Sequence, residues 1–335
     1  MTGLSCLLER YRALVCDLDG VIYRGQAAVP HAVEALSAAG LPVIYATNNA
    51  SRTPGEVAEH LVALGLPTSA EQVINSSMAG AAEVARRFLA GSPVLAIGGD
   101  GVAAALRDAG LSVVTSAADP VVAVLQGYGP QVRAVDLGEA AYAIQGGALW
   151  VATNDDLTLP TDRGIAPGNG ALVAAVALAV EVRPLVMGKP QPPLYLMASE
   201  RLGVPAEKVL GIGDRLETDV AGATAAGMDC LLVCTGVHGV RDAARAPREY
   251  RPRFVLPDLR GLTRPYADPS PHDGGVACGA ALARIDEGRL SISGDLGDDG
   301  LDGIRAALVA IWTRADEGAS AEVVTRLAEQ IPQPR

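Results

Sequence analysis

Short apolar runs alternate with segments of helical periodicity along most of the chain. The first run, residues 13–16, contains no polar residue and reads as a strand buried on both faces. Further strands are expected at 41–46, 71–74, 94–97, 121–126, 149–152, 182–187, 209–212, 229–234 and 254–256. Helices are expected at 30–39, 54–65, 76–89, 136–145, 171–180 and 194–202, with two more that end at 109 and 226. This alternation is typical of parallel α/β layers.

Two segments interrupt the alternation. Residues 153–170 are polar and rich in Gly and Pro, which predicts a long loop of the kind that often carries function. Three prolines and two glycines within 265–275 predict a linker. Beyond it, 276–285 and 289–293 predict a hairpin, followed by amphipathic helices at 301–313 and 321–330. This last part is near the lower size limit for an independent domain, so we expect it to pack on the rest.

Composition narrows the class of protein. The 335 residues are 49% hydrophobic, enough for two or three domains with sizeable cores. A net charge of −11 without a basic run argues against nucleic acid or an anionic membrane as partner. The N-terminus does not resemble a signal peptide, and the longest apolar stretch, 171–180, is too short to span a bilayer. Five cysteines, an odd count, fit buried thiols in a reducing cytoplasm.

Polar residues follow four of the expected strands. They are Asp17 and Asp19, Thr47 and Asn48, Lys189, and Asp214 and Asp219. Because the carboxyl ends of parallel strands share one edge of a sheet, we expect these side chains to converge. Clustered carboxylates repel one another, and a divalent cation such as Mg²⁺ relieves that repulsion. Mg²⁺ brings a phosphate, to which Lys and Thr donate, while one Asp attacks phosphorus and another moves the proton.

Simpler interpretations exist for several of these residues. Thr47 and Asn48 fit a helix N-cap pair, and Asp219 fits a cap of its own helix. Lys189 fits a solvated surface charge, although the chain has only one other lysine and a Gly-Lys-Pro setting favours a function. Residues 98–101, Gly-Gly-Asp-Gly, are similar to a phosphate-binding loop, but a strand-to-helix turn explains them as well.

The set and its order resemble the haloacid dehalogenase superfamily. Its four motifs are matched in turn by Asp17-Leu18-Asp19-Gly20, Thr47-Asn48-Asn49, Lys189, and Gly213-Asp214 through Thr218-Asp219. Residues 47–52, 153–156, 167–170 and 188–190 narrow the resemblance to the NagD-like branch, with its p-nitrophenyl phosphatases and phosphoglycolate phosphatases. Residues 265–335 fall outside the pattern. A reduced acetyltransferase-like module is one interpretation of them, but they lack that family's pyrophosphate-binding loop.

The resemblance implies an α/β fold with three parts. A Rossmann-like parallel sheet core is expected from 1–88 and 183–264. An inserted α/β cap that selects the substrate is expected at 89–182. A small C-terminal α+β module is expected at 265–335.

The resemblance also implies roles for the site residues. Asp17 is expected to form an aspartyl-phosphate, and Asp19 to act as acid and base and to bind Mg²⁺ through its carbonyl. Asp214 is expected to bind the metal directly, with Asp219 as a further ligand or a support. Phosphate or substrate binding is expected from Thr47, Asn48, Asn49, Lys189 and Asp156. For Arg163 of the cap, contact with the substrate and a position away from it are both open.

The expected function is Mg²⁺-dependent hydrolysis of a small phosphomonoester. Asp19 favours phosphoryl transfer, because dehalogenation of carbon needs neither this acid nor Mg²⁺. Glycerol 3-phosphate and 2-phosphoglycolate are the first choices of substrate, with pyridoxal phosphate and nucleoside monophosphates next. A non-catalytic regulator that binds a phosphorylated metabolite is the alternative from another class. We expect a homodimer whose C-terminal module packs on its own core.

Overall fold

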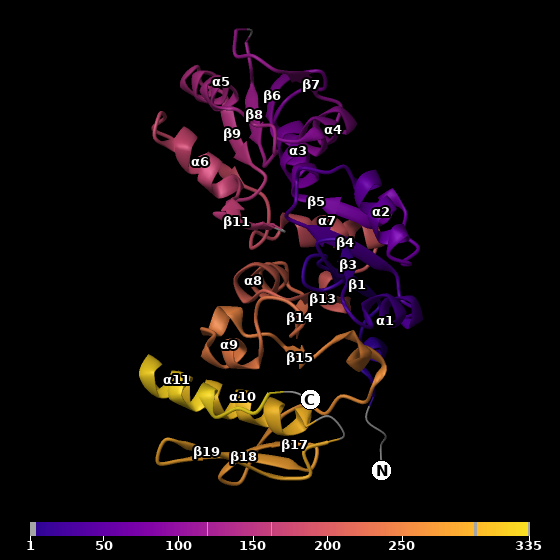
Figure 1. Cartoon of the computed structure of the whole chain (residues 1–335), viewed down its shortest axis with the longest axis vertical. Helices are drawn as coiled ribbons and strands as arrows, with labels where there is room; N and C mark the ends of the chain where they lie inside the picture. Colours follow the sequence, from indigo (N-terminus) through magenta and orange to yellow (C-terminus); the bar gives the residue numbers. More distant parts are fainter. Residues whose placement is uncertain (1–4, 119, 162, 298–299, 334–335) are drawn as a thin grey trace. The chain divides into compact units, whose positions relative to one another are not determined.

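The computed structural model describes residues 5–118, 120–161, 163–297 and 300–333. The chain forms two compact units, Met1–Pro42 with Val204–Arg335, and Val43–Gly203. In the colours of Figure 1 the first unit therefore takes both ends of the scale and the second takes the middle. No helix among the described residues is long and apolar enough to cross a membrane.

Four parallel strands form the central sheet of the first unit. In spatial order they are β15 (Phe254–Leu256), β14 (Asp229–Val233), β13 (Val209–Gly213) and β1 (Ala13–Cys16). Every residue in them is buried except Asp229. Parallel strands that are covered on both faces require continuous apolar runs. The sequence predicts all four strands from such runs.

Short elements complete the part of this unit that precedes residue 265. They are β2 (Tyr23–Arg24), β3 (Ala27–Ala28), α1 (Ala32–Ala38), a π-helical turn (Leu216–Val220), α8 (Ala221–Ala225), α9 (Val240–Arg245) and 3₁₀ turns at Leu7–Arg10, Ala206–Lys208, Arg248–Tyr250 and Leu259–Thr263. The sequence did not predict α9, because six residues are too few to establish a helical period.

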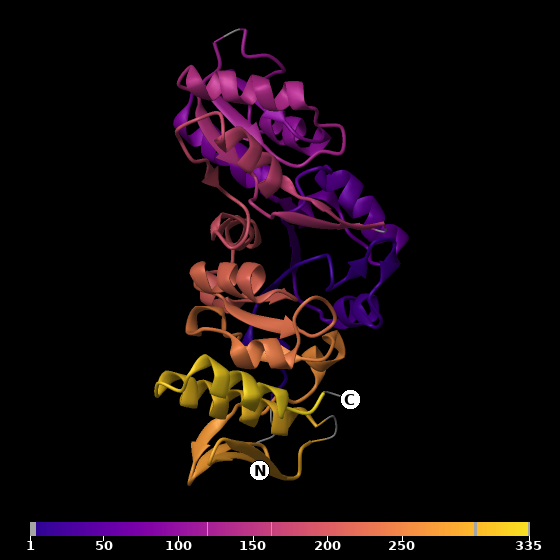
Figure 2. The ribbon, with the colours of Figure 1, turned by 60° about the vertical axis from the view of Figure 1, so that its left-hand side comes forward.

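The C-terminal part is a four-stranded antiparallel sheet with two helices, of which the first packs on the sheet and the second packs on the first. Its strands are β16 (Ser270–His272), β17 (Gly275–Cys278), β18 (Ala281–Asp286) and β19 (Arg289–Gly294), and its helices are α10 (Leu301–Asp316) and α11 (Ala321–Glu329). Figure 2 shows the two helices side by side over the sheet. The expected linker at 265–275 is therefore wrong. Pro271 misled the prediction, since an edge strand such as β16 accepts proline without losing a ladder hydrogen bond.

The C-terminal part packs on the core of its own unit. The apolar stripe expected on the first helix is buried at Leu301, Ile304, Leu308 and Ile311. Beside it, Trp312 donates its indole N–H to the carbonyl of Ala243 in α9 at 2.8 Å. Arg251 forms an ion pair with Asp316 at 2.9 Å. The packing on its own core that the sequence predicts is thus present in this unit.

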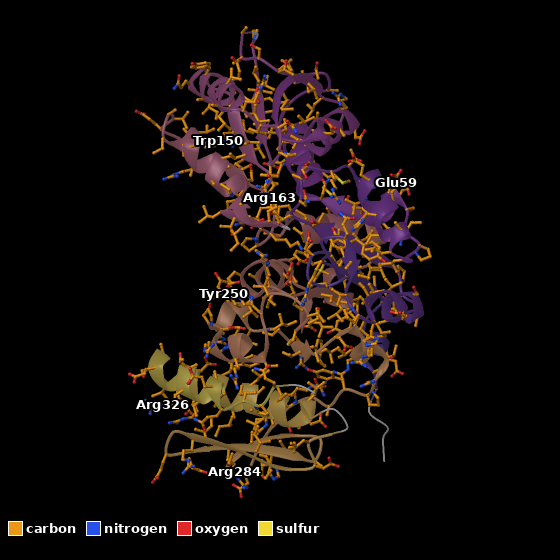
Figure 3. The ribbon with its side chains drawn as sticks, in the orientation of Figure 1. Glu59, Trp150, Arg163, Tyr250, Arg284 and Arg326 are labelled. Carbon is orange, nitrogen blue, oxygen red and sulfur yellow. The ribbon has the colours of Figure 1, made fainter. Side chains whose placement is uncertain are left out.

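A five-stranded parallel sheet organises the second unit. In spatial order its strands are β12 (Leu185–Val186), β9 (Leu149–Ala152), β8 (Ala123–Gln126), β6 (Pro93–Ile97) and β7 (Ser112–Val114). One apolar cluster contains Leu95, Val124 and Trp150, while a second contains their neighbours Val94, Leu125 and Val151. Adjacent residues of a strand point to opposite faces, so both faces of this sheet are covered. Figure 3 shows Trp150 among the side chains of this part.

Helices and a further strand pair complete the second unit. They are β4 (Val43–Thr47), α2 (Pro54–Ala63), a 3₁₀ turn (Ala70–Gln72), β5 (Val73–Asn75), α3 (Ser76–Arg87), α4 (Asp100–Asp108), α5 (Ala134–Gln145), α6 (Asn169–Ala177) and α7 (Pro193–Leu202). Strands β4 and β5 are paired in parallel. Residues 98–101 form the turn from β6 into the first residues of α4, where a Cβ on Gly99 or Gly101 would meet the backbone of Ser51 or Arg52. The interpretation as a strand-to-helix turn is therefore confirmed.

The segment 153–170 contains more regular structure than a loop. Strands β10 (Thr158–Thr161) and β11 (Gly164–Pro167) form an antiparallel hairpin within it. The hairpin was not predicted because each strand contains a proline, which argues against a strand. A two-stranded ribbon nevertheless accepts proline where the backbone N–H of that position would face solvent. The boundaries expected for core, cap and C-terminal module stay predictions.

Candidate active site

Three carboxylates of the first unit lie together at the carboxyl end of its parallel sheet. Asp17 follows β1 and Asp214 follows β13, and these strands pair with Cys16 beside Ile212. Asp219 comes from the π-helical turn just beyond. Each of the three side chains offers one oxygen, and these oxygens lie within 4.8 Å of one another. The structure thus brings these three predicted residues together.

Backbone N–H groups hold the two most buried acids, Asp214 and Asp219, each 2% exposed. The N–H of Val237 donates to Oδ2 of Asp214 at 2.6 Å. The N–H groups of Asp214 and Arg215 donate to Oδ2 of Asp219 at 3.2 and 3.1 Å. These bonds fix the direction of both carboxylates. Asp219 therefore closes the turn after β13 as well as facing the other two acids.

Glycine backbones press against the same carboxylates. A Cβ on Gly20 or Gly236 would meet the carboxylate of Asp214, and one on Gly213 would meet the side chain of Asp219. Gly20 also has φ +81°, a conformation that glycine adopts without strain. Gly20 and Gly213 both belong to the motifs that carry the family resemblance. Nothing in the pattern around Gly236 marks it, because its neighbour in space is more than twenty residues earlier in the chain.

The acid cluster suits a hard divalent cation. Three carboxylate oxygens at this spacing match the ligands that Mg²⁺ and Ca²⁺ prefer. Asp19 has an exposed side chain, and the metal-ligating group found among the described residues does not include its carboxylate. The roles predicted for Asp19, a carbonyl ligand and an acid and base, do not require that carboxylate to bind the metal.

A second polar set lies in the second unit and is built around Asn48. Its side-chain oxygen accepts the N–H of Lys189 at 2.7 Å, and its Nδ2 donates to the carbonyl of Lys189 at 3.0 Å. The same Nδ2 donates to Oδ2 of Asp156 at 3.2 Å. Lys189 is 2% exposed, so its interpretation as a surface charge is wrong. Arg163, labelled in Figure 3, lies between β10 and β11 with its side chain exposed.

The last residue of β4 and the turn after it contain the remaining predicted residues. Thr47 is 4% exposed, and its hydroxyl accepts the N–H of Asn49 at 3.0 Å. Asn49 in turn accepts the N–H and the hydroxyl of Ser51 at 3.0 and 2.7 Å. The side-chain oxygen of Asn49 therefore builds the turn. Helices α2 and α3 take their N-caps from Thr53 and Asn75, so the N-cap interpretation of Thr47 and Asn48 is wrong.

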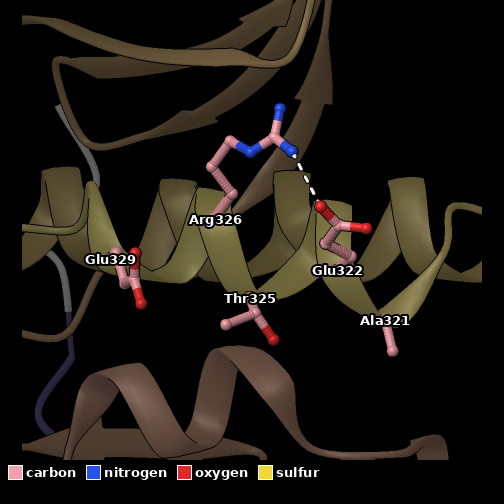
Figure 4. Close-up of a pocket in the computed structure, with 5 residues that line it drawn as sticks. All are labelled: Ala321, Glu322, Thr325, Arg326 and Glu329. Carbon is pink, nitrogen blue, oxygen red and sulfur yellow. Dashed lines mark hydrogen bonds and ion pairs between the residues drawn. The ribbon is translucent and has the colours of Figure 1, made fainter.

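A surface hollow of about 410 Å³ lies along α11, away from these residues in the chain. It is lined by Ala321, Glu322, Thr325, Arg326 and Glu329. Figure 4 shows the ion pair between Glu322 and Arg326, which spans one turn of the helix at 3.3 Å. None of the candidate site residues lines this hollow.

Two family models match the chain. A model of haloacid dehalogenase-like hydrolases matches residues 14–112, and a HAD-hydrolase-like model matches 186–262. The two spans hold Asp17 and Asn48 in the first, and Lys189, Asp214 and Asp219 in the second.

Characterised relatives match much more of the chain. D-glycerol 3-phosphate phosphatase of Mycobacterium tuberculosis is 38% identical over 92% of this chain and 88% of its own length. The 5'-nucleotidase YutF of Bacillus subtilis is 36% identical over 69% of this chain and 90% of its own length. A match as long as the first extends into the C-terminal part, whereas the second leaves about a third of the chain unmatched.

Solved structures agree with this grouping. Glycerol phosphate phosphatase from M. tuberculosis, crystallised in complex with magnesium, superposes with a TM-score of 0.85 at 37% identity, covering 92% of this chain and 93% of the other. The p-nitrophenyl phosphatase from Archaeoglobus fulgidus gives a TM-score of 0.70 at 27% identity, covering 76% and 98%. The chain belongs to the haloacid dehalogenase-like hydrolases, among their phosphatases.

Proposed function

We propose that this phosphatase hydrolyses a small phosphomonoester with Mg²⁺, and that glycerol 3-phosphate is its substrate. The observation that carries the proposal is the cluster of Asp17, Asp214 and Asp219 at the edge of the parallel sheet. A relative that matches 92% of the chain is named for glycerol 3-phosphate, which supports this choice over 2-phosphoglycolate. Nucleoside monophosphates rank next, since another relative is a nucleotidase, and pyridoxal phosphate follows.

The proposed reaction has two steps. A carboxylate oxygen of Asp17 attacks phosphorus, the bond from phosphorus to the alcohol oxygen breaks, and Asp19 gives that oxygen a proton. Water then attacks the aspartyl-phosphate while Asp19 takes up its proton, which releases phosphate and restores Asp17. The carboxylates of Asp17 and Asp214 and the carbonyl of Asp19 would hold Mg²⁺, which supplies positive charge near the phosphate oxygens.

The proposal gives the second polar set the task of binding phosphate. The amine of Lys189 would offset the negative charge that develops in the transition state. The hydroxyl of Thr47 would donate to a phosphate oxygen, and Asn48 would hold the Lys189 backbone. Asp156 would meet the hydroxyl groups of the substrate. The regulator without activity is not retained, because every acid needed for turnover is present and the relatives are phosphatases.

The test is phosphate release by the full chain with Mg²⁺. We expect kcat/KM for glycerol 3-phosphate to exceed that for 2-phosphoglycolate, AMP and pyridoxal phosphate by at least about tenfold. A chelator should abolish the activity, and added Mg²⁺ should restore it. If another of these compounds gave a higher kcat/KM, that compound and not glycerol 3-phosphate would be the substrate. Absence of turnover on all of them and on p-nitrophenyl phosphate would contradict the proposal.

We also propose a homodimer that works in the cytoplasm. Tyr142 on α5 is 63% exposed and Leu178 after α6 is 91% exposed, and apolar side chains this open favour a second protomer as cover. None of the five cysteines, each within the described residues, is in a disulfide, which suits a reducing compartment. Light scattering of the purified chain should give twice the mass of one protomer, and Tyr142→Glu should halve it.

A further inference from the structure

A chain of hydrogen bonds between asparagines leads to the Lys189 backbone inside the second unit. Asn169, the first residue of α6, donates from Nδ2 to the carbonyl of Asn154 at 2.6 Å. Asn154 donates from its own Nδ2 to the carbonyl of Asn48 at 2.8 Å. Asn48 then binds both the N–H and the carbonyl of Lys189. Asn154 and Asn169 are 4% and 2% exposed, and the mechanism above uses neither.

The far end of this chain is firmly anchored. Asn169 also donates to the carbonyl of Gln126 at 3.4 Å, and the side chain of Gln126 accepts the indole N–H of Trp150 at 3.0 Å. Backbone bonds from Gly168 and Gly170 to the carbonyls of Leu157 and Asp156 hold the start of α6 against the preceding segment. A Cβ on either glycine would meet the Asp156 or Asp155 carbonyl, so the two backbones touch. Asn169 therefore has little freedom to move.

The near end is equally constrained. The carbonyl of Asn48 accepts two donors, Nδ2 of Asn154 and the hydroxyl of Ser76 at 2.7 Å. A Cβ on Gly188 would lie 2.7 Å from Oδ1 of Asn48 and 3.0 Å from the Cβ of Asn154. The residue before Lys189 thus fits between the two asparagines, where there is no room for a side chain.

From these contacts we infer that Asn154 and Asn169 are positioning residues that act through Asn48 to fix the amine of Lys189. The inference rests on the proposed function, which places that amine at the phosphate. A misplacement of about 1 Å lowers a rate by up to about 100-fold, because the charge no longer faces the transition state. Removal of one amide donor should therefore lower kcat more than it raises KM.

The first test compares Asn154→Ala with Asn75→Ala. Asn75 is also buried in this unit, and its Nδ2 donates to the carbonyl of Arg52 at 2.9 Å, so it controls for loss of a buried amide bond. We expect kcat to fall about 10- to 100-fold in Asn154→Ala and less than about threefold in Asn75→Ala, although both lower Tm. In a Lys189→Ala background, Asn154→Ala should change kcat by less than about twofold, because the group it positions is gone.

A second variant is tested by the pH dependence of its kcat. That dependence would be absent if Asn154 only filled space. Asn154→Asp keeps the shape of the side chain but faces the Asn48 carbonyl with an acceptor when ionised, and with a donor when protonated. Its kcat relative to wild type should therefore rise as the pH falls from about 8 to about 6, since burial raises the pKa of such a carboxyl. This variant also keeps the test open if Asn154→Ala does not fold.

Three results would overturn the inference. They are an unchanged kcat in Asn154→Ala, an equal loss with and without Lys189, and a ratio for Asn154→Asp that does not depend on pH. Each of them presupposes an active wild type. Failure of the proposed function itself would appear differently, as absence of turnover in the wild type and in the Asn75→Ala control.

Discussion

The carboxylate of Asp214 lies against the backbones of Gly20 and Gly236, and the N–H of Val237 binds one of its oxygens. These three neighbours come from two loops on either side of β13 and leave the carboxylate one position. Backbone atoms therefore set the direction in which Asp214 presents its oxygens to Asp17 and Asp219. Unlike neighbouring side chains, these atoms cannot move away by a change of rotamer. At this scale the glycines matter to the acid cluster as much as the acids do.

Gly236→Ala should weaken metal binding. Its new Cβ would occupy the place of the Asp214 carboxylate, which must then turn away from the other two acids. We expect the Mg²⁺ concentration for half-maximal activity to rise about tenfold or more. Gly239→Ala is the matched control, because a Cβ there has only Asp242 Oδ2 nearby, at 4.0 Å. Equal Mg²⁺ requirements in the two variants would argue against this role for Gly236.

Asp17→Asn should abolish turnover and leave the fold intact. The amide nearly preserves the shape of the side chain but is a far weaker nucleophile. The loss in kcat should be at least about 1,000-fold, with far-ultraviolet circular dichroism unchanged. Activity equal to that of the wild type would remove Asp17 from the mechanism.

Motif residues could be predicted at this scale because their chemistry is unusual for their setting. Two aspartates after a buried strand, or one of two lysines between Gly and Pro, call for an explanation from the sequence alone. Gly236 does not, since a glycine after a strand is ordinary, and Asn154 is noticed only as part of the segment 153–156 that narrows the family resemblance. Their importance depends on neighbours that the chain brings together only on folding.

Helix α2 shows how one element is specified locally. Pro54 occupies its first turn, and Thr53 and Glu56 form a reciprocal capping box. The N–H and the hydroxyl of Thr53 both donate to Oε2 of Glu56, at 2.7 and 2.9 Å. These two hydrogen bonds, the backbone one first, lower the pKa of the Glu56 carboxyl. The start of the helix is therefore encoded within four residues.

Glu56→Gln should destabilise the fold only where Glu56 is ionised. Because its pKa is lower in the folded state, its contribution is fully present above about pH 4.3 and is lost as the pH falls through the folded value. We expect a loss of about 0.5 to 1 kcal/mol in the free energy of unfolding at pH 7, and a smaller loss at about pH 3. Urea titration measures both. Glu59→Gln, one turn further along, controls for the change in net charge, and an identical loss in it would contradict the cap.

Elements with their own local signal were therefore predicted well, and the others were not. Strands β1, β13 and β14 are continuous apolar runs, and α2 and α3 carry both caps and periodicity. The hairpin of β10 and β11, the edge strand β16 and the short helix α9 lack such a signal. Each of them is held by its surroundings, as α9 is held by Trp312 of α10. Sequence reasoning misses elements whose stability comes from tertiary contacts.

At the scale of the whole molecule, the C-terminal part completes the first unit. Tyr266 is 2% exposed and stacks edge to face on Phe254, with ring centroids 5.1 Å apart. The guanidinium of Arg305 lies 3.8 Å from the centre of the Tyr266 ring, and burial raises the pKa of the Tyr266 hydroxyl. The core strand β15 therefore has part of its cover in residues beyond 264.

Truncation after Arg264 should lower stability and solubility more than it lowers kcat. It removes the cover of Phe254 and of α9, while Asp17, Asp214 and Asp219 all remain. We expect Tm to fall by more than about 10 °C, and kcat at equal folded concentration to stay within about threefold of that of the full chain. An unchanged Tm with complete loss of kcat would contradict this prediction and would indicate a direct catalytic role for the C-terminal part.

The division of the first unit between two distant stretches of chain has a consequence for biosynthesis. Strand β1 leaves the ribosome early, but its partner β13 begins about 190 residues later, after the whole of Val43–Gly203. At about 5 to 20 residues per second the delay is roughly 10 to 40 s. During that time the segment with Asp17 has no parallel neighbour on the β13 side. The three acids of the cluster can therefore come together only once Asp214 and Asp219 have been made, long after Asp17.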